Sequence, residues 1–314
     1  MRRVLALVSL LLLAGCARPP KLLLDLAVPG ASDVIWVRDD SCVAVALLGR
    51  GVRVVDVATG RTRASWVADA LPAHAVHGLA SSARGETLAV ATQDSVRLLL
   101  TADARTVFTA PGGGRALALS NDGRRLAWSD GAYGRVLEVP SGVQHSEHRM
   151  PTERGGLVWL TRLQRFAWTD AHRILFLGVD SLPTGELADF PQDSLGPLSP
   201  SGPGGTLAVG EAGTAISVWD MPSRARRWRI GLTGDDRFNH MALSADTWYL
   251  ATARSGEVRV RWAYTGKRIA RWFPNDGGEV RDLAFSRTGH RLATVGADGR
   301  VRVWELPSFD KERR

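Results

Sequence analysis

Short apolar runs separated by glycine-containing turns recur along most of the chain. In the last such unit, residues 283–286, 291–295 and 301–304 are β-rich, and turns at residues 288–289 and 298–299 separate them. Runs of this length, rich in Val, Thr and Trp and bounded by glycine, predict β-strands joined in a meander. Beyond the N-terminal apolar run, no segment keeps the period of about 3.6 residues that marks an amphipathic helix. We therefore predict an all-β fold.

The unit repeats along the chain and is marked by a large apolar residue followed by alanine. The marker occurs at Val43-Ala44, Leu88-Ala89, Leu126-Ala127, Phe166-Ala167, Leu207-Ala208, Leu250-Ala251 and Leu292-Ala293. Successive markers lie 45, 38, 40, 41, 43 and 42 residues apart. A period of about 40 to 45 residues with several strands in each unit is typical of propeller blades. Residues 21–314 are thus predicted to form one seven-bladed β-propeller of four-stranded antiparallel blades.

The two ends of the repeat array complement each other. The last unit stops at about Leu306, after its third strand, and residues 310–314 are too short and too charged to add a fourth. An additional apolar run, residues 22–28, precedes the first unit. Unpaired strand edges are a liability that folded proteins cover. We predict that residues 22–28 complete the seventh blade, so that the N-terminal strand closes the ring.

Two segments resemble the WD repeat. Residues 292–305, LATVGADGRVRVWE, are similar to its core, with Glu305 in the place of the family's aspartate, and residues 216–220 end in the Trp-Asp dipeptide itself. The resemblance to the WD-repeat β-propeller family extends over residues 21–314 and implies the same fold. Residues 121–129 also resemble propellers of the periplasmic Tol-associated type, which again implies a propeller.

The resemblance implies that a complete repeat holds a buried hydrogen-bond relay of His, Ser or Thr, Asp and Trp. No unit of this sequence has all four residues. The seventh unit offers Thr294, Asp298 and Trp304, and the second offers His77, Thr92 and Asp94. Because half-satisfied buried polar groups are costly, we expect packing of Leu, Val and Trp to hold the blades together.

The N-terminus predicts export and lipid attachment. Arg2 and Arg3 precede an apolar run at residues 4–13, and small residues follow it. This order is typical of a signal peptide, and the run is shorter than the roughly 20 residues of a membrane-spanning helix. Residues 13–16, Leu-Ala-Gly-Cys, resemble a bacterial lipobox, which implies that Cys16 is diacylated after cleavage. An ordinary signal peptide with an accidental cysteine is the alternative.

These observations divide the chain into three parts. Residues 1–15 are predicted to be a lipoprotein signal peptide, residues 16–20 the lipidated cysteine with a short linker, and residues 21–314 the propeller. The position after Cys16 is Ala17, and not the aspartate that resembles an inner-membrane retention signal. In a Gram-negative host the predicted location is therefore the outer membrane, facing the periplasm.

The sequence carries no recognisable catalytic or cofactor-binding motif. The seven histidines are His74, His77, His145, His148, His172, His240 and His290. Their closest pairs lie in loop or strand segments without a cysteine or carboxylate set nearby, so we predict neither a metal site nor a cofactor. We expect a protein that is not an enzyme. The alternative is a hydrolase or lyase with its site in the central channel, since a propeller funnel can hold a small substrate.

The positive charge is concentrated near the C-terminus. The net charge is +8, and residues 221–314 hold 19 Lys and Arg against 11 Asp and Glu. The predicted partner-binding residues are Arg224, Arg226, Arg227, Trp228, Arg229, Lys267, Arg268 and Arg271. Arginine and tryptophan often carry the binding energy of interfaces. Four other arginines, Arg259, Arg261, Arg300 and Arg302, alternate with apolar residues along predicted strands and are expected to be structural.

A lipid anchor would place this basic surface outside the cytoplasm. The expected partners are therefore other envelope proteins or anionic envelope polymers. The lipid anchor would attach the protein to the membrane, and nucleic acid is not an expected partner. The sequence thus predicts a membrane-anchored WD-repeat lipoprotein that acts as a non-catalytic protein-interaction scaffold in the bacterial envelope.

Overall fold

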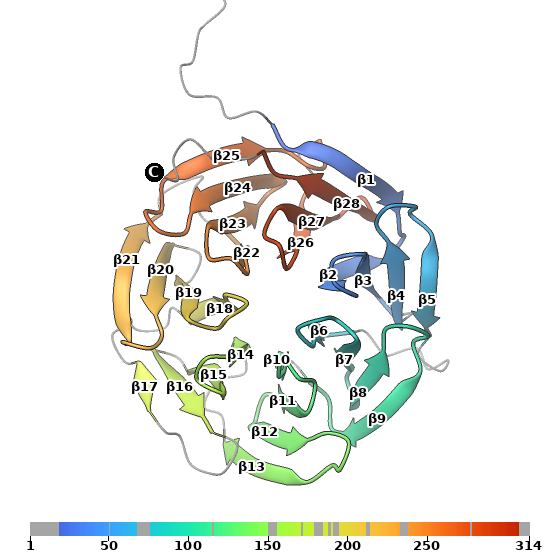
Figure 1. The fold of residues 1–314 in the computed structure, drawn as a ribbon, viewed down its shortest axis with the longest axis vertical. Helices are drawn as coiled ribbons and strands as arrows, with labels where there is room; N and C mark the ends of the chain where they lie inside the picture. The colour runs from blue at the N-terminus through green and yellow to red at the C-terminus, as the bar shows by residue number, and fades with distance from the viewer. Residues whose placement is uncertain are drawn as a thin grey trace, which may run out of the picture.

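In the computed structural model the chain forms seven four-stranded antiparallel sheets arranged in a ring (Figure 1). This confirms the predicted all-β seven-bladed propeller. The structure describes residues 19–49, 51–67, 76–114, 116–149, 156–170, 172–178, 185–187, 190, 195–211, 214–232, 238–276 and 278–307. Cys16 and the predicted signal peptide lie outside the described residues. Within the described part of the chain, no helix is long and apolar enough to cross a membrane.

Each blade runs from the centre of the ring to its rim. Blade 1 consists of β2 (Ala31–Val37), β3 (Cys42–Leu47), β4 (Gly51–Asp56) and β5 (Thr62–Trp66). Blade 2 consists of β6 (Gly78–Ser81), β7 (Thr87–Ala91), β8 (Ser95–Leu100) and β9 (Thr106–Pro111). Blade 3 consists of β10 (Ala116–Leu119), β11 (Arg125–Ser129), β12 (Tyr133–Glu138) and β13 (Gln144–Arg149). Blade 4 consists of β14 (Leu157–Leu160), β15 (Arg165–Asp170), β16 (Arg173–Leu177) and β17 (Glu186–Leu187).

The remaining blades follow the same plan. Blade 5 consists of β18 (Leu195–Pro200), β19 (Thr206–Glu211), β20 (Ala215–Asp220) and β21 (Ala225–Gly231). Blade 6 consists of β22 (His240–Leu243), β23 (Tyr249–Arg254), β24 (Glu257–Trp262) and β25 (Arg268–Trp272). Blade 7 combines β26 (Val280–Phe285), β27 (Arg291–Gly296) and β28 (Arg300–Glu305) with β1 (Lys21–Ala27).

The repeating apolar pair marks the second strand of each blade, which is buried on both sides. Leu126 and Ala127 on β11 have no exposed surface. Leu126 packs in a cluster with residues of blade 2, whereas Ala127 packs in a cluster with residues of blade 4. Successive side chains of a strand point to opposite faces of the sheet, so one pair serves both neighbouring blades. The core of the protein is therefore a series of contacts between blades.

The ring closes through the N-terminal strand, as predicted. β1 pairs antiparallel with β28, from Lys21 opposite Glu305 to Ala27 opposite Arg300. Figure 1 shows β1 in blue as the outermost strand of the otherwise red seventh blade. Arg300 Nε donates to Asp25 Oδ1 at 2.6 Å and so adds an ion pair to the ladder. The first and last strands of the propeller thus stabilise each other.

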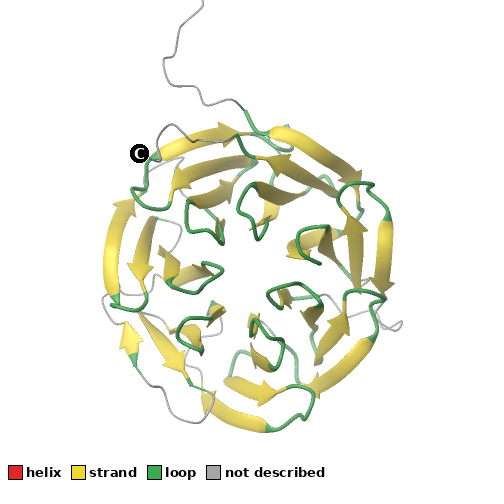
Figure 2. Cartoon of the chain, viewed as in Figure 1, coloured by secondary structure: helices red, strands yellow, loops and turns green. Residues whose placement is uncertain are grey.

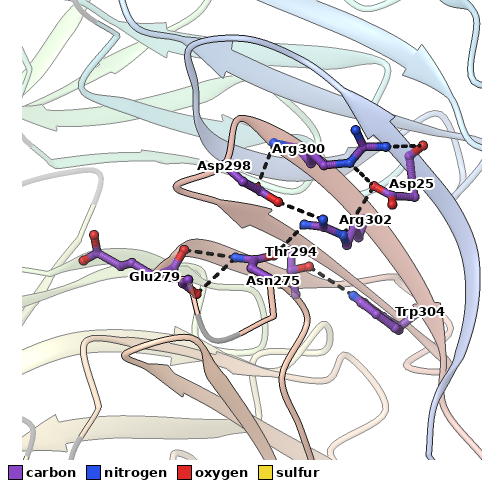
Figure 3. A network of polar contacts seen from close by, with 9 residues as sticks. Asp25, Asn275, Glu279, Thr294, Asp298, Arg300, Arg302 and Trp304 are labelled. Atoms are coloured by element: carbon purple, nitrogen blue, oxygen red, sulfur yellow. Dashed lines mark hydrogen bonds and ion pairs between the residues drawn. The ribbon is translucent and has the colours of Figure 1, made fainter.

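A polar network lies along this junction (Figure 3). Arg302 is buried, and its guanidinium donates to Asn275 Oδ1 at 2.6 Å and to Asp298 Oδ2 at 2.7 Å. Its Nε also lies 3.3 Å from Asp25 Oδ1 on β1. Asn275 Nδ2 donates in turn to the backbone carbonyl of Glu279 at 3.0 Å. Arg302 therefore links β28, β1 and the loop before β26, which agrees with its expected structural role.

The repeats form only parts of the polar relay, as expected from their incomplete sequences. Trp304 Nε1 donates to Thr294 Oγ1 at 3.0 Å, but Asp298 pairs with Arg302 instead. In blade 2, Thr92 Oγ1 donates to Asp94 Oδ1 at 3.0 Å. The described blades therefore contain short polar pairs within a largely apolar core.

The direction of β1 distinguishes the two faces of the ring. Because neighbouring strands of a blade are antiparallel, its first and third turns lie at one face and its second turn at the other. Lys21 lies opposite Glu305, at the end of β28, and so at the face that carries the first and third turns. We call this the β1 face, and the other the opposite face. Figure 2 shows the first turns of the blades as green loops around the centre of the ring.

Candidate functional site

The predicted arginine run forms the turn before β21 and the first half of this outermost strand of blade 5. The guanidinium of Arg224 lies 5.4 Å from the ring centroid of Phe176, and that of Arg226 lies 5.6 Å from the centroid of Trp219. Stacking on an aromatic ring orients a guanidinium through its face and leaves its edge for other partners. Arg224 and Arg226 are both exposed at the β1 face.

Arg227 lies on the same face and is partly neutralised there. Its Nη2 donates to Asp220 Oδ1 at 2.8 Å, and its guanidinium lies 5.3 Å from the ring centroid of Tyr264 in blade 6. Hydrogen bonds from the Ser223 hydroxyl and from Arg227 lower the pKa of Asp220 to about 2. Asp220 is therefore ionised at any pH near neutrality and offsets the charge of Arg227.

The last two residues of the run have structural partners. Arg229 donates from Nε and Nη2 to Glu211 Oε2, at 2.9 Å and 2.7 Å, and the Glu211 side chain is only 2% exposed. Trp228 Nε1 donates to the carbonyl oxygen of Ala263 at 2.8 Å and so joins blade 5 to blade 6. These contacts account for Trp228 and Arg229 without a partner molecule.

The second predicted group is divided between the two faces. Lys267 and Arg268 are exposed at the start of β25, on the β1 face. Arg271 lies near the other end of β25, where its Nε is 2.5 Å from Glu257 Oε1. The Glu257 carboxylate is buried and also receives Arg259, so it holds Arg271 at the opposite face.

The structure thus brings five of the eight predicted partner-binding residues together on the β1 face. We call Arg224, Arg226, Arg227, Lys267 and Arg268 the basic patch. The turn before β25 packs directly on β21, because a Cβ atom on Gly266 would lie 2.1 Å from Ile230 Cδ1. Sequence analysis missed Lys21, which starts β1 on the same face of the next blade. It stands alone among apolar residues, so no local charge pattern singles it out.

The central channel opens at the β1 face. Its cavity of about 820 Å³ is lined by apolar side chains of the first strands, such as Leu117 and Phe285, and by charged turn residues such as Arg84. The turns of neighbouring blades bind each other: Arg287 N donates to Asp40 Oδ1 at 2.7 Å, and Ala83 N donates to the carbonyl oxygen of Asn121 at 2.9 Å. These bonds between turns hold the mouth of the channel in one shape.

Three titratable residues lie on the first strands of three successive blades. His240 begins β22, and its Nδ1 lies 3.9 Å from Asp282 Oδ1 on β26. Asp282 Oδ2 accepts a hydrogen bond from Val34 N at 2.9 Å, next to Asp33 on β2. Burial, followed by the charge of Asp33, raises the pKa of Asp282 to about 8. Burial also lowers the pKa of His240.

Among the described residues, no group of three or more His, Cys, Asp or Glu side chains is placed to hold a metal ion. A separation of 3.9 Å between His240 and Asp282 exceeds hydrogen-bond range. Sequence analysis missed Asp33 and Asp282, because only the closed ring brings them together.

The last repeat matches a known family of domains. Residues 266–305 match the WD domain, G-beta repeat family. The matched unit contains β25, the outer strand of blade 6, and β26, β27 and β28 of blade 7. Together with the seven-bladed ring, this match supports a WD-repeat propeller.

Similarity to curated proteins covers about a third of the chain. Transducin beta-like protein 3 of Mus musculus is 30% identical over 95 residues, which are 30% of this chain and 12% of that protein. The Protein LST8 homolog of Dictyostelium discoideum is 29% identical over 105 residues, which are 33% of this chain and 34% of that protein. These matches thus span a small part of the mouse protein and about a third of the Dictyostelium protein.

A solved structure matches the whole ring. The β-propeller domain of Cps50 (Swd1) from Myceliophteria thermophila aligns with a TM-score of 0.79 and covers 92% of this chain and 100% of that domain. The two sequences are 14% identical, so the likeness concerns the fold alone.

Proposed function

We propose that the protein is a lipid-anchored, non-catalytic interaction scaffold of the bacterial envelope, which binds an anionic component through the basic patch. The observation that carries this proposal is that Arg224, Arg226, Lys267 and Arg268 are exposed on the same face of two neighbouring blades. Rigid rings with exposed charged faces favour the docking of partners, because docking costs them little conformational entropy.

The anchoring part of the proposal is based on the sequence. Residues 13–16 resemble a lipobox, and Cys16 would be acylated there. Two or more acyl chains hold a protein stably at a bilayer, whereas one chain binds reversibly. In a Gram-negative host we propose the outer membrane, facing the periplasm, since Ala17 follows the cysteine.

The non-catalytic part is supported by the geometry of the inner strands. A general base must reach the proton that it abstracts through a hydrogen bond. Asp282 and His240 are too far apart for a hydrogen bond between them, and the Asp282 carboxylate accepts the Val34 amide. The Asp282 carboxylate therefore joins blade 7 to blade 1. We propose that it is structural, as an alternative to a channel hydrolase or lyase.

Fractionation combined with chemical crosslinking tests the proposal. We expect the wild-type chain in the membrane fraction with an acylated Cys16, and Cys16→Ser in the soluble fraction. In the anchored protein, a variant with Arg224→Gln, Arg226→Gln and Arg227→Gln should lose crosslinks to its anionic partner in the envelope, whether that partner is lipid or protein. A matched variant with Arg61→Gln, Arg105→Gln and Arg124→Gln removes three exposed arginines of blades 1 to 3. This variant should keep the crosslinks. An unmodified Cys16, or equal crosslinks in both variants, would contradict the proposal.

A further inference from the structure

We infer that the anionic partner of the basic patch is the phospholipid surface to which the chain is anchored, so that the β1 face lies on the membrane. This inference rests on the proposed lipid anchor at Cys16. It is carried by three observations on the structure: where β1 begins, which charges surround that point, and which apolar side chains accompany them.

The start of β1 fixes which face is near the anchor. Lys21 lies at the β1 face, opposite Glu305. Lys21 follows Cys16 by five positions, and five residues reach at most about 18 Å when fully extended. An acylated Cys16 would therefore hold this edge of the ring within that distance of the lipid headgroups. The opposite face begins at the far end of the same strand.

The charges near that edge suit an anionic surface. Lys21 has a side chain that is 74% exposed, and Arg224, Arg226, Lys267 and Arg268 are exposed on the neighbouring blades 6 and 5. Glu305 lies 3.9 Å from Lys21, and Asp220 pairs with Arg227. Asp246, in the first turn of blade 6, accepts the Ser244 hydroxyl, so three carboxylates accompany six basic side chains. The excess is therefore basic. Each Lys or Arg near an anionic bilayer increases the binding constant roughly fivefold.

Apolar side chains lie beside these charges. Leu22 and Leu23 at the start of β1 are 44% and 36% exposed, although they belong to a strand in the ladder. Tyr264, in the turn before β25, is 56% exposed, and Arg227 stacks on its ring. Tyrosine is enriched at membrane–water interfaces, and basic side chains there extend their charges to the headgroups. A soluble acidic partner would explain the charges but not the exposed leucines at the anchor.

Vesicle binding of the mature chain, residues 16–314 with Cys16→Ser, tests the basic surface in the absence of the lipid anchor. We expect binding to vesicles of phosphatidylglycerol and phosphatidylcholine, and little binding to phosphatidylcholine alone. Lys21→Gln, Arg224→Gln and Arg226→Gln together should weaken binding to the anionic vesicles roughly hundredfold. The matched variant with Arg53→Gln, Arg149→Gln and Arg173→Gln should bind nearly as the parent does, because these arginines lie toward the ends of β4, β13 and β16 at the opposite face. Equal losses in both variants would overturn the inference.

The orientation is tested with two exposed aromatic residues of the same blade. Tyr264 lies on the β1 face, whereas Phe273 follows the end of β25 at the opposite face and is 50% exposed. A fluorophore on Tyr264→Cys should be quenched by brominated lipid when the acylated protein is reconstituted, and one on Phe273→Cys should not. Melting temperatures check that both variants fold.

The outcomes separate the inference from the proposed function. Acylated, membrane-bound protein with quenching at position 273, or at neither position, leaves the anchor intact and overturns the inference. Absence of acylation in mass spectrometry overturns the anchor, whatever the vesicles show. A lysine and arginine triple variant that binds vesicles normally but loses a crosslinked envelope protein would make the patch a protein site instead.

Discussion

Arg229 neutralises the buried carboxylate of Glu211 across blade 5, with hydrogen bonds to Oε2 at 2.9 Å and 2.7 Å and to Oε1 at 3.2 Å. Removing one partner of a buried ion pair leaves the other charge without compensation. We expect Arg229→Gln to lower the free energy of unfolding by roughly 3 kcal/mol. Arg226→Gln, on the same strand but exposed, should change it by less than about 0.5 kcal/mol. Urea unfolding of both variants checks this, and similar midpoints would contradict the structural role of Arg229.

The closure of the ring predicts that its first strand is essential. Deletion of residues 21–27 removes the whole ladder between β1 and β28 and exposes the edge of blade 7. We expect the melting temperature to fall strongly and the protein to become prone to aggregation. Deletion of residues 310–314, which lie outside the described residues, is the control and should have little effect. Calorimetry of the two truncations measures the difference.

Asp282 predicts a loss of stability as the pH rises. Its pKa is raised from 3.8 to about 8 in the folded chain, so the folded state binds a proton that the unfolded state releases between about pH 4 and 8. The free energy of unfolding should decrease through this range, by at most about 1.4 kcal/mol per pH unit for one proton. Below pH 4 the group is protonated in both states and contributes no further change.

Asp282→Asn tests the origin of this dependence. Asparagine keeps an oxygen that can accept the hydrogen bond of Val34 N and cannot ionise. We expect the unfolding free energy of this variant to be nearly independent of pH between 5 and 8. Asp220→Asn is the opposite control: the lowered pKa of Asp220 adds stability above about pH 4 that is lost only as the pH falls toward 2. A parallel slope in wild type and Asp282→Asn would assign the effect to another group.

Gly296 predicts a steric limit at the closing blade. A Cβ atom at this position would lie 2.3 Å from Asp298 Oδ1 and 2.4 Å from Asn275 Nδ2, within the network around Arg302. We expect Gly296→Ala to cost about 1 to 3 kcal/mol of stability, as overpacking in a core does. Gly231→Ala is the control, because no atom lies within 4 Å of its added Cβ. Thermal unfolding of the two variants should differ clearly.

The repeating features of the fold were predictable, because each blade repeats the same pattern of strands, turns and buried residues. The Leu126-Ala127 pair and its equivalents mark strands that contact two neighbours, and this requirement recurs in every blade. The role of β1 also followed from the sequence. The repeat array lacks a strand at its C-terminal end and has an additional strand at its N-terminal end, and pairing the two completes the seventh blade.

The functional assignments were less predictable, because they depend on long-range pairing. Arg229 and Arg226 look alike in the sequence, yet only Arg229 reaches Glu211, which lies two strands away in the sheet. Asp33 and Asp282 are close only because the ring closes between blades 7 and 1. A charge pattern identifies basic residues, but the partner of each one is set by the tertiary structure.

The strand that closes the ring is also the strand from which the proposed anchor leaves, and this has a mechanical consequence. β1 runs from the β1 face to the opposite face, and its hydrogen bonds to β28 are perpendicular to it. A bilayer at the β1 face would pull on Lys21 along the strand axis, so every bond of the ladder would share the load in shear. A pull outward from the rim would instead break the bonds one at a time. The anchored ring would thus resist tension from the membrane best in the orientation inferred above.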